Sequence, residues 1–181
     1  MVEHPLLELA LTAGAARAAI LTQEQIVLSE TFRDICQTNQ CGSFGRCWMC
    51  PPFVGPIREL MDQVRSYPRA VWYQSVSRIE DSFDIEGMFA AAGEHALLSQ
   101  RIQGQLRKLL KKPWLHLSCG GCHLCPVCAK VTGEPCRKPD QALSSLESYG
   151  VDVYRTTITT DLPYINGQNT VTYFGMILFS E

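Results

Sequence analysis

The sequence predicts an α/β or α+β fold, in which a small mixed sheet is flanked by helices and carries two cysteine-rich metal-binding loops. Three observations lead to this prediction. Short β-branched and aromatic runs alternate along the chain with segments of helical periodicity. The 181 residues are 46% hydrophobic, which is enough for one globular domain with a packed core. The nine cysteines fall into two dense groups. We therefore expect a single metal-binding domain over residues 1–181.

The N-terminal half predicts alternating helices and strands. Leu6 and Ala10 share one face of a short helix, and the apolar run that follows it is typical of a buried strand. Pro51 and Pro52 stop any helix after the first cysteine group. A second amphipathic helix and a β-branched, aromatic strand come next. The expected elements are a helix at 3–12, a strand at 15–21, a helix at 29–36, an irregular segment at 36–52, a helix at 55–67 and a strand at 69–77.

The C-terminal half begins with a long helical stretch, in which Gly87, Gly93 and Gly104 favour local breaks. Pro113 ends this stretch, and a short strand then leads into the second cysteine group. Gly150 is a natural C-terminal cap for a further helix. The expected elements are a helix at 83–111, a strand at 114–118, a helix at 139–149, a segment at 151–160 that fits either a strand or a helix, a turn at Asn166–Gly167 and a strand at 170–180.

Charge and hydropathy exclude several classes of protein. The 16 Lys and Arg residues nearly balance the 18 Asp and Glu residues, so nucleic acid is not an expected partner. No uninterrupted apolar stretch reaches transmembrane length, and a membrane is not expected as a partner either. The residues Met1–Pro5 lack the positive start of a signal peptide. We therefore expect a cytoplasmic, reducing compartment, and the oligomeric state stays open.

The cysteines predict metal binding rather than disulfides. Nine is an odd number, and no export signal is visible. In a reducing compartment, closely spaced thiols serve as metal ligands or redox groups.

The first cysteine group comprises Cys36, Cys41, Cys47 and Cys50, and it is expected to form a metal site. It ends in a C-x2-C pair followed by two prolines. Proline after a ligand fixes the backbone and supplies no N–H donor of its own.

The second group offers five thiols for four positions. Cys119, Cys122, Cys125 and Cys128 fall at an interval of three, and Cys136 follows eight residues later. In bacterial ferredoxins, three ligands come from one short run and the fourth is remote. The first three or the last three thiols of the run fit this rule. Cys136 is a good remote ligand for the later register, and Cys119 is then spare or belongs to the first group.

The spacing favours an iron–sulfur cluster over zinc. Three successive C-x2-C steps crowd a tetrahedral zinc ion and suit a cluster with four iron corners. Zinc remains the alternative, with Cys47 and Cys50 paired with Cys122 and Cys125 across the fold. His123 lies inside the run and could replace a thiolate.

The basic and aromatic residues near the cysteines, and the basic end of the long helix, each allow more than one interpretation. Basic residues next to the second group either offset the charge of a cluster or are ordinary solvated charges. Trp48 and Trp114 either shield a metal site or belong to the core. The basic end of the long helix either docks an acidic redox partner or a nucleic-acid backbone, or is a solvated face. The basic residues are His123, Lys130, Arg137 and Lys138 beside the cysteines, and Arg101, Arg107, Lys108, Lys111 and Lys112 on the helix.

Four pieces of the chain carry a resemblance: Cys41–Gly45 with Cys50–Pro52, Cys122–Cys128, Glu134–Pro139 and Ser145–Val153. Together they resemble a prokaryotic family of small, cysteine-rich, predicted metal-binding proteins of unassigned function, over most of the chain from about Ala15. The resemblance implies that the second motif starts at Cys122, so that Cys119 is an extra thiol. It also implies that Cys47 is additional and that Cys36 matches loosely. It implies metal binding and iron–sulfur clusters, and brings no established reaction.

We therefore expect an iron–sulfur protein that transfers electrons to or from a partner redox enzyme. One 4Fe-4S cluster is expected on Cys122, Cys125, Cys128 and Cys136, with a second site in the first cysteine group. Two alternatives stay open: a zinc-stabilised binding module with no redox role, and a cluster-dependent enzyme with an open iron site. The sequence has no phosphate-binding glycine loop or serine nucleophile elbow, and predicts no catalytic residue.

Overall fold

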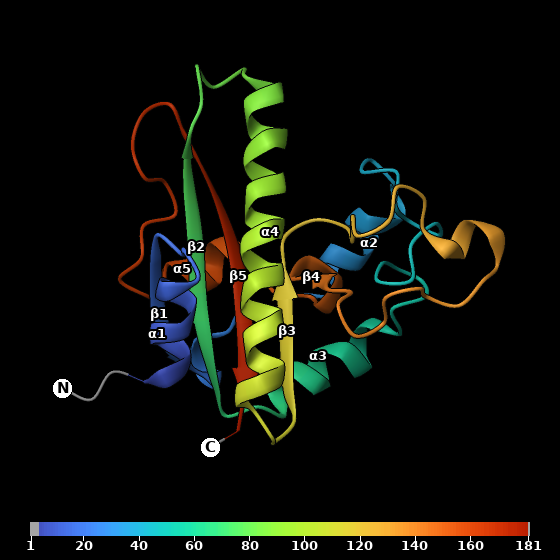
Figure 1. Cartoon of the computed structure of the whole chain (residues 1–181), viewed down its shortest axis with the longest axis horizontal. Coiled ribbons are helices and arrows are strands. Elements are labelled where there is room, and N and C mark those ends of the chain that lie inside the picture. The colour runs from blue at the N-terminus through green and yellow to red at the C-terminus, as the bar shows by residue number, and fades with distance from the viewer. Residues whose placement is uncertain (1–3, 181) are drawn as a thin grey trace.

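The structure, a computed structural model, describes residues 4–180 and contains a five-stranded sheet flanked by helices (Figure 1). The strand order is β1-β2-β5-β3-β4; β3 and β4 are parallel, and the other pairs are antiparallel. The predicted mixed sheet with flanking helices is confirmed. The strands are β1 (Arg17–Thr22), β2 (Arg69–Arg78), β3 (Trp114–Ser118), β4 (Ser144–Ser145) and β5 (Thr170–Phe179).

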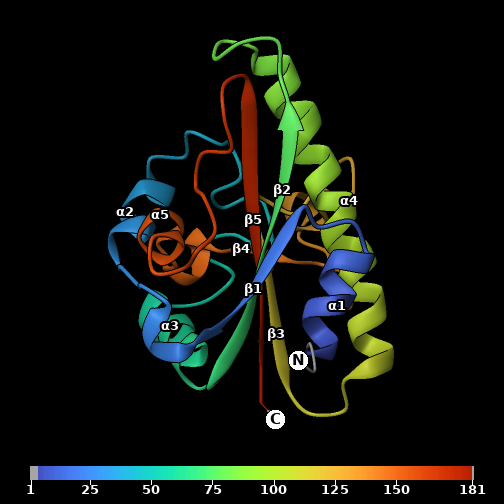
Figure 2. The ribbon, with the colours of Figure 1, turned by 90° about the vertical axis from the view of Figure 1, so that its left-hand side faces the viewer.

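Helices cover both faces of the sheet (Figure 2). Along β2, Val71 and Tyr73 pack on the face covered by α1 and α4, while Ala70 and Trp72 pack on the opposite face. This alternation follows from the two-residue period of a strand. The helices are α1 (Pro5–Thr12), α2 (Thr31–Gln37), α3 (Ile57–Arg65), α4 (Ile85–Leu109) and α5 (Val153–Thr157), with 3-10 turns η1 (Gln23–Gln25), η2 (Ala129–Thr132) and η3 (Glu147–Tyr149).

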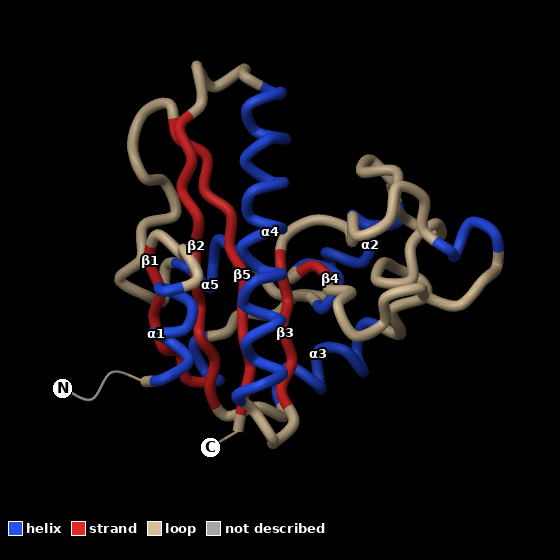
Figure 3. The backbone as a smooth tube through the Cα atoms, viewed as in Figure 1, coloured by secondary structure: helices blue, strands red, loops and turns tan. Residues whose placement is uncertain are grey.

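The cysteines lie mainly in two loop segments beyond the β3–β4 edge of the sheet (Figures 1 and 3). Cys36 is the exception, because it lies near the end of α2. The two loop segments lie against each other: the indole nitrogen of Trp48 donates a hydrogen bond of 2.9 Å to the carbonyl of Glu134. The sheet edge therefore brings together two regions that are about 70 residues apart in sequence.

The helix predicted at 139–149 is wrong. Leu117 pairs with Ser144 in parallel register, and the amide of Leu146 donates to the carbonyl of Ser118 at 2.9 Å. Strand pairing with β3 therefore replaces helical hydrogen bonds, although Leu143 and Leu146 are buried as the apolar pattern predicts. Gly150 does act as a cap, with φ of 78°, but of the short turn η3.

The long helix α4 is continuous, so the predicted breaks at its glycines are also wrong. Its N-terminus is capped by Asp84, whose carboxylate accepts from the amide of Gly87 at 2.8 Å. Its inner face, including Leu98 and Ile102, is buried against the sheet. Gly93 and Gly104 lie on the exposed side. Each glycine costs about 1 kcal/mol relative to alanine, and burial of the inner face offsets this.

The remaining elements agree closely with the predicted ones. The strands expected at 69–77, 114–118 and 170–180 correspond to β2, β3 and β5. The ambiguous segment 151–160 contains α5, which Asp152 caps by accepting from the amide of Arg155 at 2.8 Å. Glu3, which was assigned to the first helix, lies outside the described residues. Within residues 4–180, every helix is too short or too polar to cross a bilayer.

Candidate metal centre

The second cysteine run starts where β3 ends. Gly120 has φ of 67°, a left-handed conformation that turns the chain away from the sheet. At Gly121 a Cβ atom would lie 3.1 Å from the hydroxyl of Ser43 and 3.7 Å from the sulfur of Cys50. The absence of a side chain at Gly121 therefore lets the second cysteine loop lie directly against the first.

Thiols from both groups line one small cavity, which we name the five-thiol cavity. Its volume is about 20 Å³. Cys47 comes from the first loop, and the other four thiols come from the second. The five are Cys47, Cys122, Cys125, Cys128 and Cys136.

A second cavity, which we name the three-thiol cavity, has a volume of about 250 Å³. It is lined by Cys36, Cys41 and Cys50, together with Glu147 and the backbone of the turn at Gly120. The first sequence group is therefore divided, because Cys47 faces the other cavity. Thiolates and a carboxylate are both ligands for transition metals.

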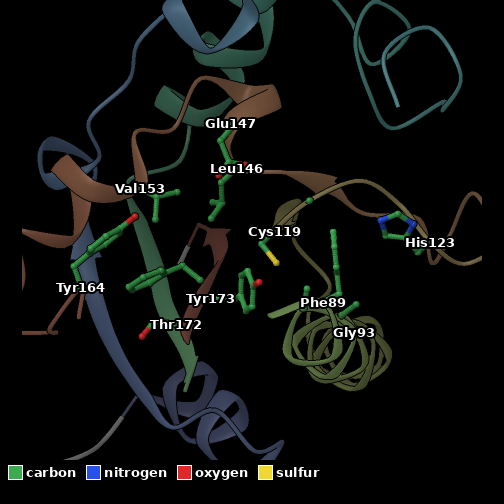
Figure 4. A pocket seen from close by; sticks show the side chains of 14 residues that line it. Phe89, Gly93, Cys119, His123, Leu146, Glu147, Val153, Tyr164, Thr172 and Tyr173 are labelled. Carbon is green, nitrogen blue, oxygen red and sulfur yellow. The ribbon is translucent and has the colours of Figure 1, made fainter. Parts of the chain in front are cut away.

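Cys119 belongs to neither thiol cavity. It lines a larger pocket between α4 and β5, shown in Figure 4. Burial, reinforced by the nearby negative charge of Glu147, raises the pKa of Cys119 to about 12. Cys119 is therefore a neutral thiol at physiological pH.

The ligand assignments stay predictions. In the part of the chain that is described, no three Cys, His, Asp or Glu side chains already stand in position around one metal ion. The four thiols assigned to a cluster nevertheless share one cavity, and Cys119 lies apart from them. The later register of the run is thus compatible with the structure.

Within the Cys47–Cys50 pair, Cys47 is the more acidic thiol. The Cys50 thiol donates a hydrogen bond to the Cys47 sulfur and, with the backbone amides of Met49 and Cys122, lowers the pKa of Cys47 to about 6. The same hydrogen bond, together with burial, raises the pKa of Cys50. Cys47 is therefore a thiolate at neutral pH, which is the form that binds metals.

Two of the predicted basic residues lie at the five-thiol cavity. Arg137 and Lys138 both line it. Arg137 donates to the carbonyl of Val127 at 3.1 Å and to Glu134 at 2.9 Å, and Lys138 donates to the carbonyl of Leu124 at 3.2 Å. These cations are held in place beside the sulfurs, where they can offset negative charge.

The two tryptophans have different roles. Trp48 lines the five-thiol cavity, and the ammonium of Lys130 lies 4.8 Å from its ring centroid. Trp114 packs instead against the hydrophobic core beneath α1 and α4, at the opposite end of β3 from the cysteines. The shielding role is therefore compatible with Trp48 only.

His123 does not reach the five-thiol cavity. It is exposed and lines the same larger pocket as Cys119, together with an adjoining groove (Figure 4). The structure brings Cys47 of the first loop, and not His123, to the four thiols of the second loop.

A buried polar network behind Cys119 was not predicted. The Tyr73 hydroxyl lies 2.7 Å from His116 Nε2 and 2.8 Å from the Ser99 hydroxyl, which in turn lies 2.7 Å from Ser118. His116 Nδ1 lies 2.9 Å from Gln103. Burial lowers the pKa of His116 to about 3, so the network is neutral. A signal was available: His95, Ser99 and Gln103 repeat every four residues on the inner face of α4.

Glu147 is the second residue that sequence reasoning missed. It is partly buried and lines both the three-thiol cavity and the larger pocket. Burial raises its pKa. Its one sequence signal is its place within the Ser145–Val153 piece that carried the family resemblance.

Comparison with known proteins gives one match. The family model described as "Predicted metal-binding protein (DUF2284)" matches residues 19–179. Searches of curated proteins and of solved structures gave no match. The match confirms the resemblance to a metal-binding family of unassigned function, while a prokaryotic origin stays a prediction. Because it covers more than half of the chain, the protein belongs to this family of predicted metal-binding proteins.

Proposed function

We propose that the protein holds an iron–sulfur cluster at the five-thiol cavity and transfers electrons to or from a partner redox protein. The observation that carries this proposal is the convergence of thiols from two distant loops on one cavity. A 4Fe-4S cluster takes four cysteine ligands and supplies one-electron redox chemistry when bound. Cys122, Cys125, Cys128 and Cys136 would hold it, with Cys47 as the adjacent fifth thiol.

The donor set supports a cluster more than zinc. A structural zinc ion takes four ligands in a tetrahedron, whereas five thiols and two cations meet here. Arg137 and Lys138 would offset the negative charge of a thiolate-bound cluster. The cavity of about 20 Å³ has room for about one water-sized group, and a cluster of four iron and four sulfide ions is larger than that. Binding therefore requires the irregular loops around Cys47 and Cys128 to move apart, as expected when metal binding is coupled to folding.

The surface beside this cavity supports electron exchange with a protein partner. Cys125 and Cys128 are only partly buried, and the side chain of Val127 between them is 56% exposed. Lys130, which lies over the Trp48 ring, and Lys138 bring positive charge to this surface, while the charge of Arg137 is offset by Glu134. An acidic partner surface would be attracted to it, which raises the rate of association.

The three-thiol cavity favours a second candidate function, a cluster-dependent enzyme. Three thiols line this cavity, those of Cys36, Cys41 and Cys50. The carboxyl group of Glu147 also lines it and is a further candidate ligand. A centre with three cysteine ligands leaves one metal position for a carboxylate or for a substrate.

Metal and sulfide analysis of anaerobically purified protein tests the proposed function. We expect a brown protein with about four iron and four sulfide per cluster, whose visible absorption bleaches with dithionite. Colourless protein that contains only zinc would contradict the proposal and support the zinc-stabilised module.

A further inference from the structure

A pocket of about 510 Å³ lies between α4, β5, η3 and the turn after β3 (Figure 4). Its volume falls within the range of ~300–1,000 Å³ that is common for small-molecule sites. Neither the proposed electron transfer nor the family match assigns it a role.

We propose that this pocket binds a small organic molecule with a planar aromatic body and an N–H or O–H group that donates a hydrogen bond to Glu147. The inference goes beyond the proposed electron transfer and does not depend on it, because the pocket is formed by protein groups distinct from the five thiols.

The walls of the pocket fit a planar aromatic body. The rings of Tyr164 and Phe174 are parallel to within 9°, with centroids 5.9 Å apart, and Trp72 stacks behind Phe174 at 5.0 Å. Phe89, which is 74% exposed, stands on the α4 side of the same pocket (Figure 4). Phe174 is only 3% exposed, so a flat ring inserted here would contact the more exposed rings of Tyr164 (43%) and Phe89.

The face of α4 leaves room for that ring. Ala92, Gly93 and Ala96 line the pocket, at helical spacing from Phe89. A Cβ atom added at Gly93 would meet nothing within 4 Å. The space beside Gly93 is therefore not filled by the packing of α4 against the sheet.

The polar end of the pocket fits a hydrogen-bond donor. The hydroxyl of Tyr173 already donates to the carbonyl of Met88 at 2.9 Å, and Thr172 already accepts from Asn166 at 3.0 Å. The carboxyl of Glu147 hydrogen-bonds Ser145, and its two oxygens offer further acceptor positions. A carboxyl oxygen accepts a hydrogen bond from an N–H or O–H group whether or not this carboxyl, whose pKa is raised by burial, is ionised.

The position of the pocket relates it to both thiol cavities. It shares Gly120 and Glu147 with the three-thiol cavity. An adjoining groove of about 350 Å³ shares Cys119 with the pocket and Cys122 with the five-thiol cavity. A bound molecule would therefore lie next to the three-thiol cavity and, across the groove, near the five-thiol cavity.

Calorimetric titration with three indoles tests the inference on the protein as purified. Indole has a planar body and an N–H donor, 1-methylindole lacks the donor, and indole-3-carboxylate adds a negative charge. We expect indole to bind and 1-methylindole to bind roughly tenfold more weakly, because one hydrogen bond to the Glu147 carboxyl is lost. Indole-3-carboxylate should bind most weakly, because its charge would be desolvated in a largely apolar pocket. Equal affinity for indole and 1-methylindole, or no binding of indole, would overturn the inference.

Two glycine variants locate the binding site on α4. Gly93→Leu places a side chain in the pocket, and Gly104→Leu is its matched control, since both glycines lie on the exposed side of α4 with open space at the Cβ position. We expect Gly93→Leu to abolish indole binding and Gly104→Leu to retain it. We expect Glu147→Ala, which removes the acceptor oxygens, to reduce the preference for indole over 1-methylindole. Unchanged indole binding in Gly93→Leu would place the ligand elsewhere and overturn the inference, whatever metal the protein contains.

Discussion

Cys47 and Cys50 are separated by two residues, yet they line different cavities. The two sulfurs also differ in acidity, because the hydrogen bond from Cys50 stabilises the thiolate of Cys47. Cys119 is different again, since burial keeps its thiol protonated. Spacing in the sequence treats these three cysteines as equivalent, whereas their surroundings separate a metal-ready thiolate from two protonated thiols.

An ultraviolet titration tests this difference in acidity. Thiolates absorb near 240 nm, so metal-free, reduced protein should show an absorbance step near pH 6 as Cys47 loses its proton. The Cys47→Ser variant should lack that step. Cys119→Ser is the matched control and should retain it, because the pKa of Cys119 is about 12. A step near pH 6 that survives in Cys47→Ser would contradict the assignment.

At the scale of elements, the contact between α4 and the sheet is partly polar. His95 on α4 is fully buried, and its Nδ1 lies 2.8 Å from the hydroxyl of Ser75 on β2. Burial lowers the pKa of His95 to about 4. The helix is therefore positioned by apolar packing together with specific hydrogen bonds that require a neutral imidazole.

This burial predicts destabilisation by acid. The unfolded chain protonates His95 near its ordinary pKa of about 6.5, while the folded protein keeps it neutral down to about pH 4. The unfolded state thus binds more protons in this window, so the free energy of unfolding falls as the pH decreases from 6.5 to 4, by a few kcal/mol. Urea denaturation at several pH values should show a flatter pH dependence for His95→Gln. The exposed His123→Gln is the control and should keep the wild-type slope; an unchanged slope in His95→Gln would refute the explanation.

Much of the fold was predictable, because apolar patterning is a local signal. The predicted strand at 114–118 coincides with β3, and β2 and β5 differ from prediction by one residue at one end. The segment at 139–149 was not predictable in this way. Its apolar residues have helical spacing, but hydrogen bonds with β3, distant in sequence, determine its structure. Tertiary pairing overrides local periodicity in this segment.

The candidate site was predictable in its chemistry and only partly in its grouping. Spacing left two registers of the run open, and the family resemblance favoured the register without Cys119; the structure places the thiols of that register at one cavity with Cys136 and Cys119 at another. The zinc alternative did pair Cys47 with the second loop, but spacing could not show that Cys50 faces a different cavity, since that depends on the contact between Gly121 and the first loop. Glu147 could not be identified because a lone carboxylate carries no pattern.

At the scale of the whole molecule, the sheet acts as a support for chemistry at one edge. The two hydrophobic clusters are formed by the strands and their covering helices, while the loops that carry most of the cysteines extend beyond β3 and β4 (Figure 1). The organic-ligand pocket lies where these two parts meet. The metal loops can therefore change conformation on binding without disturbing the sheet.

The central claim is that the five-thiol cavity holds an iron–sulfur cluster. It is tested most directly by measuring iron and sulfide in an anaerobically purified variant with Cys122, Cys125 and Cys128 all replaced by alanine, beside a Cys119→Ala control. Relative to wild type, the account predicts that the triple variant loses about four iron and four sulfide and that the control loses none. Wild-type iron and sulfide in the triple variant, or their loss in Cys119→Ala, would contradict it.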